Sequence, residues 1–122
     1  MNVHGGRAAE LSGDVAVALH QSDLEVRRIR PAATLHDVGK TALPKSLLNK
    51  QGPLTAQEWE FMRRHTLIGE RIVLAAPALA STAPLIRSSH ERSDGLGFPT
   101  ACGVRRSLWA RRSSRHVTAS TR

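Results

Sequence analysis

Apolar residues recur with a helical period in the first third of the chain. Four of them fall on one stripe when residues 3–19 are projected onto a helix: Val3, Leu11, Val15 and Leu19. Many alanines lie between them, and we predict a helix over residues 3–19. Ser22 or Asp23 can cap a second helix that runs toward His36, because a short polar side chain accepts hydrogen bonds from the free N–H groups of a first turn.

Proline and glycine divide the middle of the chain. Pro31 lies inside the second predicted helix, where its ring crowds the carbonyl four residues earlier, so we expect a kink near Arg27 or a new helix start at Pro31. Beyond Gly39, residues 41–53 contain prolines and a glycine, which is typical of a connection. Within this connection we expect a short turn around residues 45–48.

The clearest local signal is a capping box. Thr55 and Glu58 stand at the N-cap and N3 positions, and this pair predicts a helix start. On a single helix projected from there, five residues share one face with His65: Trp59, Met62, Gly69, Ile72 and Val73. We therefore predict that His65 points inward. Arg63 and Arg64 belong to the opposite face, which we expect to be solvated.

The sequence of residues 75–99 predicts short elements. Residues 75–84 contain two prolines and indicate a break, and a further helix is expected over residues 83–90 with His90 near its end. Residues 94–99, Asp-Gly-Leu-Gly-Phe-Pro, predict a rigid turn in which the Asp94 carboxylate accepts backbone N–H bonds. Because aromatic residues make up 3% of the chain, the core must be aliphatic and rich in alanine, which favours an all-α fold.

Length and charge narrow the class of protein. A chain of 122 residues can bury one core, so we expect one domain. The net charge of +8 would suggest nucleic acid, but all ten acidic residues precede residue 100 and six arginines follow it. We assign the excess to residues 100–122, an Arg/Ser-rich tail that we expect to be disordered or unrelated to the domain. No apolar stretch is long enough for a membrane segment and there is one cysteine, so we expect a cytoplasmic protein. Because the excess positive charge lies in the tail, we expect it to bind no specific nucleic acid.

Candidate chemistry is concentrated in residues 35–40, Leu-His-Asp-Val-Gly-Lys. An imidazole and a carboxylate on adjacent residues can bind a divalent metal, and the Lys40 ammonium can bind a nearby phosphate. The other interpretation is a helix C-terminus, with His36 on the last carbonyls and Gly39 as a left-handed cap. The later residues His65 and His90 favour the metal interpretation.

In their order and spacing these motifs resemble the HD-GYP family, a branch of the HD superfamily of metal-dependent phosphohydrolases. The resemblance covers residues 3–99 and includes the His-Asp pair, His65, and His-Glu-Arg followed by Gly-Phe-Pro. It implies an all-α HD-type helical bundle, incomplete here on its C-terminal side, that holds divalent iron or manganese ions. It also implies a cyclic di-GMP phosphodiesterase, and contacts with other cyclic di-GMP signalling proteins.

The resemblance also implies the site. The metal ligands carried over from the family are His4, His36, Asp37, His65 and His90. Asp37 and Lys40 take catalytic roles, and Lys40 also holds a substrate phosphate. Substrate contacts are further implied for the signature loop of Gly97, Phe98 and Pro99, in which Phe98 replaces the usual Tyr.

Two departures from the family pattern lower the expected activity. Ser89 stands where the family has a second His, and residues 100–122 contain no Asp or Glu that could serve as a further ligand. We therefore assign residues 1–99 to the N-terminal part of an HD-GYP domain and residues 100–122 to an aberrant tail. We expect fewer bound metal ions than the two or more of the intact family, or none, and impaired hydrolysis. The alternative is a catalytically inactive regulatory or protein-interaction module of cyclic di-GMP signalling.

Overall fold

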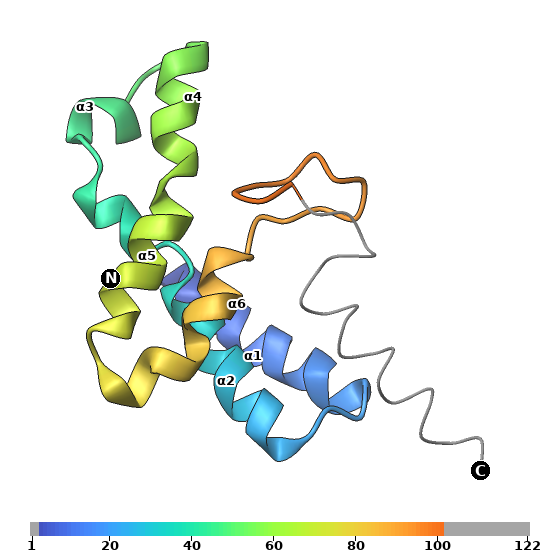
Figure 1. The fold of residues 1–122 in the computed structure, drawn as a ribbon. Coiled ribbons are helices and arrows are strands. Elements are labelled where there is room, and N and C mark those ends of the chain that lie inside the picture. Colours follow the sequence, from blue (N-terminus) through green and yellow to red (C-terminus); the bar gives the residue numbers. More distant parts are fainter. Residues whose placement is uncertain (1–2, 102–122) are drawn as a thin grey trace.

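The structure is a computed structural model that describes residues 3–101, with the side chains of residues 5–101. The regular elements of this part are all helical, as Figure 1 shows, and it contains no strand, which confirms the all-α prediction. In chain order they are α1 (Val3–Ala18), α2 (Asp23–Leu35), the 3-10 helix η1 (Val38–Ala42), α3 (Lys45–Leu48), α4 (Ala56–Arg63), α5 (His65–Leu74), the 3-10 helix η2 (Pro77–Thr82) and α6 (Ala83–Arg87).

Helices α1 and α2 pack against each other through small residues of α1. Gly13 and Ala16 are buried, and a Cβ atom on Gly13 would overlap the Arg30 side chain. The larger apolar residues of the predicted stripe point elsewhere, since Leu11 is 67% exposed and Val15 is 49% exposed. The helix over residues 3–19 is confirmed, but its packing face is the one that permits the closest approach of two backbones and not the one with the largest side chains.

The start of α2 is capped as predicted, because the Ser22 side chain accepts a hydrogen bond from the Glu25 N–H at 3.3 Å. The expected new helix start at Pro31 is wrong: α2 continues through this residue to Leu35. A proline inside a helix removes one N–H donor, and the packing of α2 on α1 and α6 compensates for this loss.

The predicted capping box of α4 is confirmed. The Thr55 hydroxyl accepts from the Glu58 N–H at 3.2 Å, and the Glu58 carboxylate accepts from the Thr55 N–H at 2.7 Å. The single long helix is wrong, because the helical bonding is interrupted at Arg64 and α5 begins at His65. Trp59 consequently lies 47% exposed and not on the face that buries His65.

The core lies where α2, α5 and α6 meet. Its buried apolar residues are Ala32, Val73, Ala83 and Ile86. The aliphatic, alanine-containing core is as the composition predicted. The predicted helix over residues 83–90 is shorter, and His90 follows the end of α6 by three residues. The turn over residues 94–99 is confirmed, with the Asp94 carboxylate accepting from the Leu96 N–H at 3.0 Å.

One close backbone contact joins η1 to α5. Gly39 is buried, and a Cβ atom on it would overlap the carbonyl oxygen of His65 and lie 2.7 Å from the Gly69 nitrogen. A Cβ atom on Gly69 would in turn lie 3.4 Å from the Gly39 nitrogen. The two glycines therefore allow η1 to lie directly on α5.

One expectation falls largely outside this description. The predicted tail of residues 100–122 lies outside the described residues apart from its first two positions. Of the helices within residues 3–101, none combines the length and the apolar character that crossing a membrane requires.

We predict that Gly39→Ala destabilises the fold. Its methyl group would meet backbone atoms of α5, which cannot move as a flexible side chain can, so the free energy of unfolding should fall by about 1–3 kcal/mol or more. Urea unfolding monitored by circular dichroism measures this change. The matched control is Gly6→Ala, since Gly6 is helical with open space around its Cβ position and should gain about 0.5–1 kcal/mol. Equal stability of the two variants would contradict the role of Gly39.

Candidate metal centre

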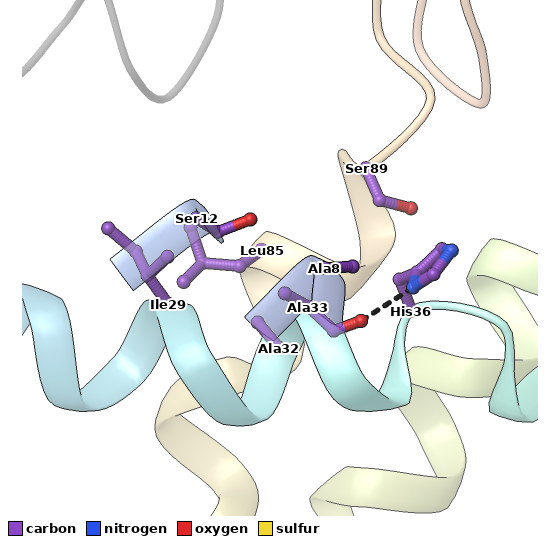
Figure 2. A pocket seen from close by; sticks show the side chains of 8 residues that line it. All are labelled: Ala8, Ser12, Ile29, Ala32, Ala33, His36, Leu85 and Ser89. Carbon is purple, nitrogen blue, oxygen red and sulfur yellow. Dashed lines mark hydrogen bonds between the residues drawn. The ribbon is translucent and has the colours of Figure 1, made fainter. Parts of the chain in front are cut away.

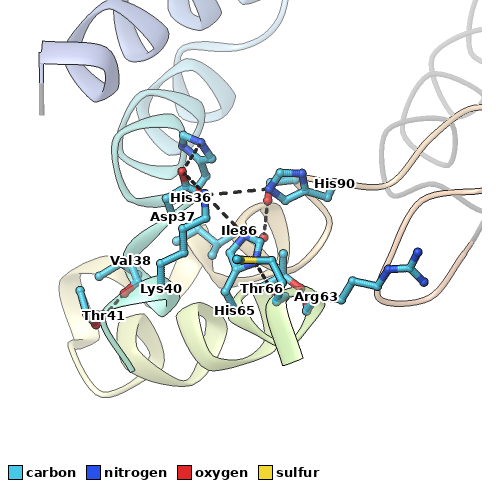
Figure 3. A network of polar contacts seen from close by, with 12 residues as sticks. His36, Asp37, Val38, Lys40, Thr41, Arg63, His65, Thr66, Ile86 and His90 are labelled. Carbon is cyan, nitrogen blue, oxygen red and sulfur yellow. Dashed lines mark hydrogen bonds and ion pairs between the residues drawn. The ribbon is translucent and has the colours of Figure 1, made fainter. Parts of the chain in front are cut away.

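Three side chains from separate segments converge on one point. Asp37 follows α2 and precedes η1, His65 is the first residue of α5, and His90 follows α6. Each offers one ligand atom, and these atoms all lie within 4.8 Å of one another. Figure 3 shows the three side chains facing the same space. The fold thus gathers residues that lie up to 53 positions apart in the sequence.

The converging atoms have no hydrogen-bond partner among residues 3–101. The Nε2 atom of His65 lies 3.4 Å from Oδ1 of Asp37, and Nε2 of His90 lies 4.0 Å from the same oxygen. All three atoms are buried and unbonded. A buried polar atom without a partner is costly, so such a group calls for a cation or a proton between its members.

The hydrogen bond of the second ring nitrogen, Nδ1, fixes the tautomer of His65. Its Nδ1 lies 2.6 Å from the Met62 carbonyl oxygen, and because a carbonyl can only accept, Nδ1–H donates. In the neutral ring Nε2 then carries a lone pair and faces the Asp37 carboxylate, so two acceptors point at each other. Metal-binding histidines commonly donate their second N–H to a backbone carbonyl in this way. The donor set fits a divalent metal ion.

The charge states of Asp37 and His90 also suit a metal site. Burial raises the pKa of the Asp37 carboxyl, but the hydrogen bond from Lys40 and the nearby histidine and lysine charges outweigh it and hold the pKa below its usual value. The Lys40 ammonium lies 2.9 Å from Asp37 Oδ2. Burial, followed by the nearness of His65, lowers the pKa of His90. Near neutral pH the site therefore offers a carboxylate and a neutral His90 imidazole.

His36 lies beside this triad but not within it. Its Nε2 is 3.5 Å from Asp37 Oδ2, the oxygen that faces Lys40, and its ring centroid is 6.4 Å from that of His90. Its Nδ1–H donates to the Ala33 carbonyl at 2.7 Å, as the helix-end interpretation expected. The other half of that interpretation is wrong, because Gly39 does not have the positive φ of a left-handed cap. The side chain of His4 lies outside the described part of the chain.

The loop of residues 97–99 folds back onto His90. The rings of Phe98 and His90 stack with centroids 4.9 Å apart and planes 9° apart, and the Phe98 N–H donates to the His90 carbonyl at 3.2 Å. A Cβ atom on Gly97 would overlap that same carbonyl oxygen, so a glycine is needed there for the loop to close. Pro99 follows Phe98 through a cis peptide bond. The loop thereby orients one member of the triad.

Sequence reasoning missed the carbonyls that orient the rings. Met62 lies three residues before His65 and Ala33 three residues before His36, so each histidine bonds back to its own preceding turn. A backbone carbonyl leaves no mark in the residue types. The only available signal was the position of each histidine at a helix boundary.

A small apolar cavity of about 310 Å³ lies next to His36, between α1, α2 and α6 (Figure 2). Ser89 lies at the same end of it as His36. Its lining residues are Ala8, Ser12, Ile29, Ala32, Ala33, His36, Leu85 and Ser89.

The helical fold and the His-Asp cluster define an α-helical domain with a candidate metal site, and the comparisons agree. A family model described as HD domain matches residues 1–105. A cyclic di-GMP phosphodiesterase of Thermotoga maritima is 42% identical over 98 residues, covering 79% of this chain and 27% of the relative. The cyclic di-GMP phosphodiesterase response regulator RpfG of Xanthomonas campestris pv. campestris is 41% identical over 95 residues, covering 76% and 25%.

A third relative has a different named substrate. The 3'3'-cGAMP-specific phosphodiesterase 2 of Vibrio cholerae is 38% identical over 86 residues, covering 64% of this chain and 15% of the relative. The chain thus spans about a quarter or less of the length of these curated relatives. The chain belongs to the HD domain family, in the HD-GYP branch that its motifs resemble.

We predict that Mn²⁺ raises the melting temperature of the chain and that Asp37→Ala removes the rise. A metal held by the triad binds only the folded state, so at a hundred times its dissociation constant it should add about 2.7 kcal/mol to the free energy of unfolding. Differential scanning fluorimetry over a Mn²⁺ series measures the shift. Asp14→Ala is the control, because this exposed carboxylate pairs with Arg30 outside the site and its loss should leave the shift intact. A shift of equal size in both variants would contradict the assignment.

Proposed function

We propose that the chain forms the metal-binding part of a phosphodiesterase that hydrolyses cyclic di-GMP. The observation that carries the proposal is the set of three buried polar atoms, on Asp37, His65 and His90, that face one another without a hydrogen-bond partner among the described residues. The names of the curated relatives support the reaction class and the cyclic dinucleotide substrate.

Asp37, His65 and His90 would hold the metal, and His36 and His4 extend the proposed ligand set. Imidazole with a carboxylate suits iron or manganese, in agreement with the family resemblance. When bound there, a divalent ion acidifies a coordinated water and neutralises charge on phosphoryl oxygens. Asp37 presents Oδ1 to His65 and His90 while Oδ2 accepts from Lys40, so one carboxylate serves both the metal side and the substrate side.

Lys40 is placed to hold a substrate phosphate. Its ammonium lies against Asp37 Oδ2, is partly exposed, and has two further N–H donors for phosphoryl oxygens. The bond to Asp37 restricts the ammonium to the edge of the triad, where a phosphodiester would meet it. Lys40 thus binds and orients the phosphate. Phe98 and Gly97 line the cavity on the side of His90, and Pro99, which follows them, completes the proposed substrate loop.

A regulatory module without turnover is the second candidate, and Ser89 favours it. The Ser89 hydroxyl donates to the Ile86 carbonyl at 2.9 Å and so ends the α6 segment instead of serving the site. A hydroxyl is also a poor metal ligand at neutral pH compared with the imidazole of the family pattern. Such a module would act through contacts with other proteins of cyclic di-GMP signalling.

Metal content and hydrolysis together separate these two functions. We expect the purified chain, loaded with Mn²⁺ or Fe²⁺ and desalted, to retain metal and to convert cyclic di-GMP to a linear product that chromatography detects. Asp37→Ala should lose both properties, since it removes the carboxylate shared by His65 and Lys40. Retained metal without hydrolysis would favour the regulatory module. The absence of both metal and hydrolysis would refute the proposed enzyme.

We predict that Ser89→His strengthens metal binding. Ser89 lines the cavity that contains His36 and also the cavity that contains His90, so an imidazole there would lie between the two rings. One added nitrogen ligand should tighten Mn²⁺ binding by roughly tenfold or more, measured by competition with a fluorescent chelator. Ser88→His is the matched control, because the Ser88 hydroxyl bonds to Pro84 and lines neither cavity. Equal affinities for the two variants would count against a ligand role for position 89.

A further inference from the structure

A second cavity opens on the α4 side of His90. Its volume is about 500 Å³, within the range of small-molecule sites, and it is lined by two arginines and two aromatic rings in addition to His90. The residues that carry the argument are Trp59, Arg63, His90, Arg92 and Phe98. Nothing in the metal-centre chemistry described above uses the two residues from α4.

The cavity adjoins the metal centre at His90. His90 belongs to the triad and also lines the cavity, and Phe98, which stacks on His90, forms part of its wall. Lys40 does not line it. Figure 3 shows the Arg63 side chain extending away from Lys40 and Asp37. A nucleoside attached to a phosphodiester at the triad and Lys40 could therefore reach this cavity past His90.

Trp59 supplies an uncovered aromatic face. Its side chain lies in the first turn of α4 and is 47% exposed, although it is among the largest apolar side chains of the chain. Stacking of a nucleobase on an aromatic side chain is worth about as much as a good hydrogen bond to a charged group. An exposed indole on the wall of a cavity beside a phosphodiester site is suited to this role.

Arg63 supplies a free guanidinium on the same side of α4. It lies four residues after Trp59, which places the two side chains next to each other on a helix. Its guanidinium carbon lies 5.8 Å from the centroid of the Phe98 ring, and Arg63 forms no ion pair with any residue from 3 to 101. Arg92 differs, because Asp94 already accepts from its guanidinium at 2.6 Å. Arg63 is thus the arginine available to a ligand.

We propose that this cavity binds a guanine base of the cyclic dinucleotide, with Trp59 stacking on the base and Arg63 donating to its O6 and N7 atoms. The inference rests on the proposed function for the placement of the phosphodiester. A guanidinium matches the two acceptors on that edge of guanine, whereas adenine presents an amino donor in place of O6. Arg63 is accordingly a specificity-determining residue that favours guanine over adenine.

The test uses the fluorescence of Trp59 itself. The chain has two tryptophans, so in the Trp109→Phe variant of the full chain Trp59 is the only indole. We expect cyclic di-GMP to quench its emission, because a stacked base lies directly on the ring, and cyclic di-AMP to require a concentration roughly tenfold or more higher. The titrations are run with and without Mn²⁺. The inference would be overturned if neither cyclic di-GMP nor cyclic di-AMP quenched the emission, whether Mn²⁺ was present or absent.

Three variants on α4, measured by calorimetry in the otherwise unchanged chain, divide the roles. Trp59→Ala should weaken cyclic di-GMP binding on the order of tenfold, and Trp59→Phe should restore much of it. Arg63→Ala should weaken cyclic di-GMP binding by a similar factor while leaving cyclic di-AMP nearly unchanged. Arg64→Ala is the matched control, since its guanidinium lies over Phe61, 5.2 Å from that ring, and does not line the cavity.

The outcomes separate this inference from the proposed enzyme. Hydrolysis of cyclic di-GMP with unchanged affinity in Trp59→Ala and Arg63→Ala would overturn the guanine site and leave the phosphodiesterase standing. Guanine-selective quenching with no hydrolysis would support the guanine site and count against the enzyme. An equal loss of affinity for cyclic di-GMP and cyclic di-AMP in Arg63→Ala would show that Arg63 binds phosphate, which overturns its role in base selection.

Discussion

The geometry of the site depends on one backbone contact, that of η1 with α5. Gly39 and Gly69 leave no side chain between these segments, so the peptide of Gly39 lies against the carbonyl of His65. Asp37 precedes Gly39 by two residues, and His65 begins α5. The separation of the carboxylate from the imidazole is therefore set by two backbones in contact, which are much stiffer than side-chain torsions.

The charges at the site follow from how the two Asp37 oxygens are divided. Oδ2 faces Lys40 and His36, and Oδ1 faces His65 and His90. The hydrogen bond from Lys40 helps to keep the carboxyl ionised despite its partial burial. Meanwhile the carbonyl of Met62 holds the His65 ring with its lone pair toward Oδ1. A fold that leaves acceptors facing each other in its interior gives up stability that only a bound cation or proton restores.

Local signals in the sequence predicted local structure well. The caps at Ser22 and Thr55 depend on hydrogen bonds between residues three positions apart, so the residue types alone contain the information. The helix break at Arg64 and the exposure of Leu11 could not be predicted in this way, because both depend on which segment packs against which. The convergence of His65 and His90 was expected from the family resemblance, since no periodicity relates residues on α5 to a loop after α6.

The cavity beside His90 shows why hydrophobic patterning is a weak guide to binding residues. Patterning separates Trp59 from Arg63, since it assigns the apolar residue to the core face and the charged one to solvent. Helix geometry joins them, because residues four apart lie one above the other. In the structure both line one cavity, and each is exposed. An aromatic and an arginine at this spacing, near residues proposed to bind phosphate, therefore indicate a nucleotide site better than either residue type does alone, since a nucleobase needs a flat face and an edge donor at once.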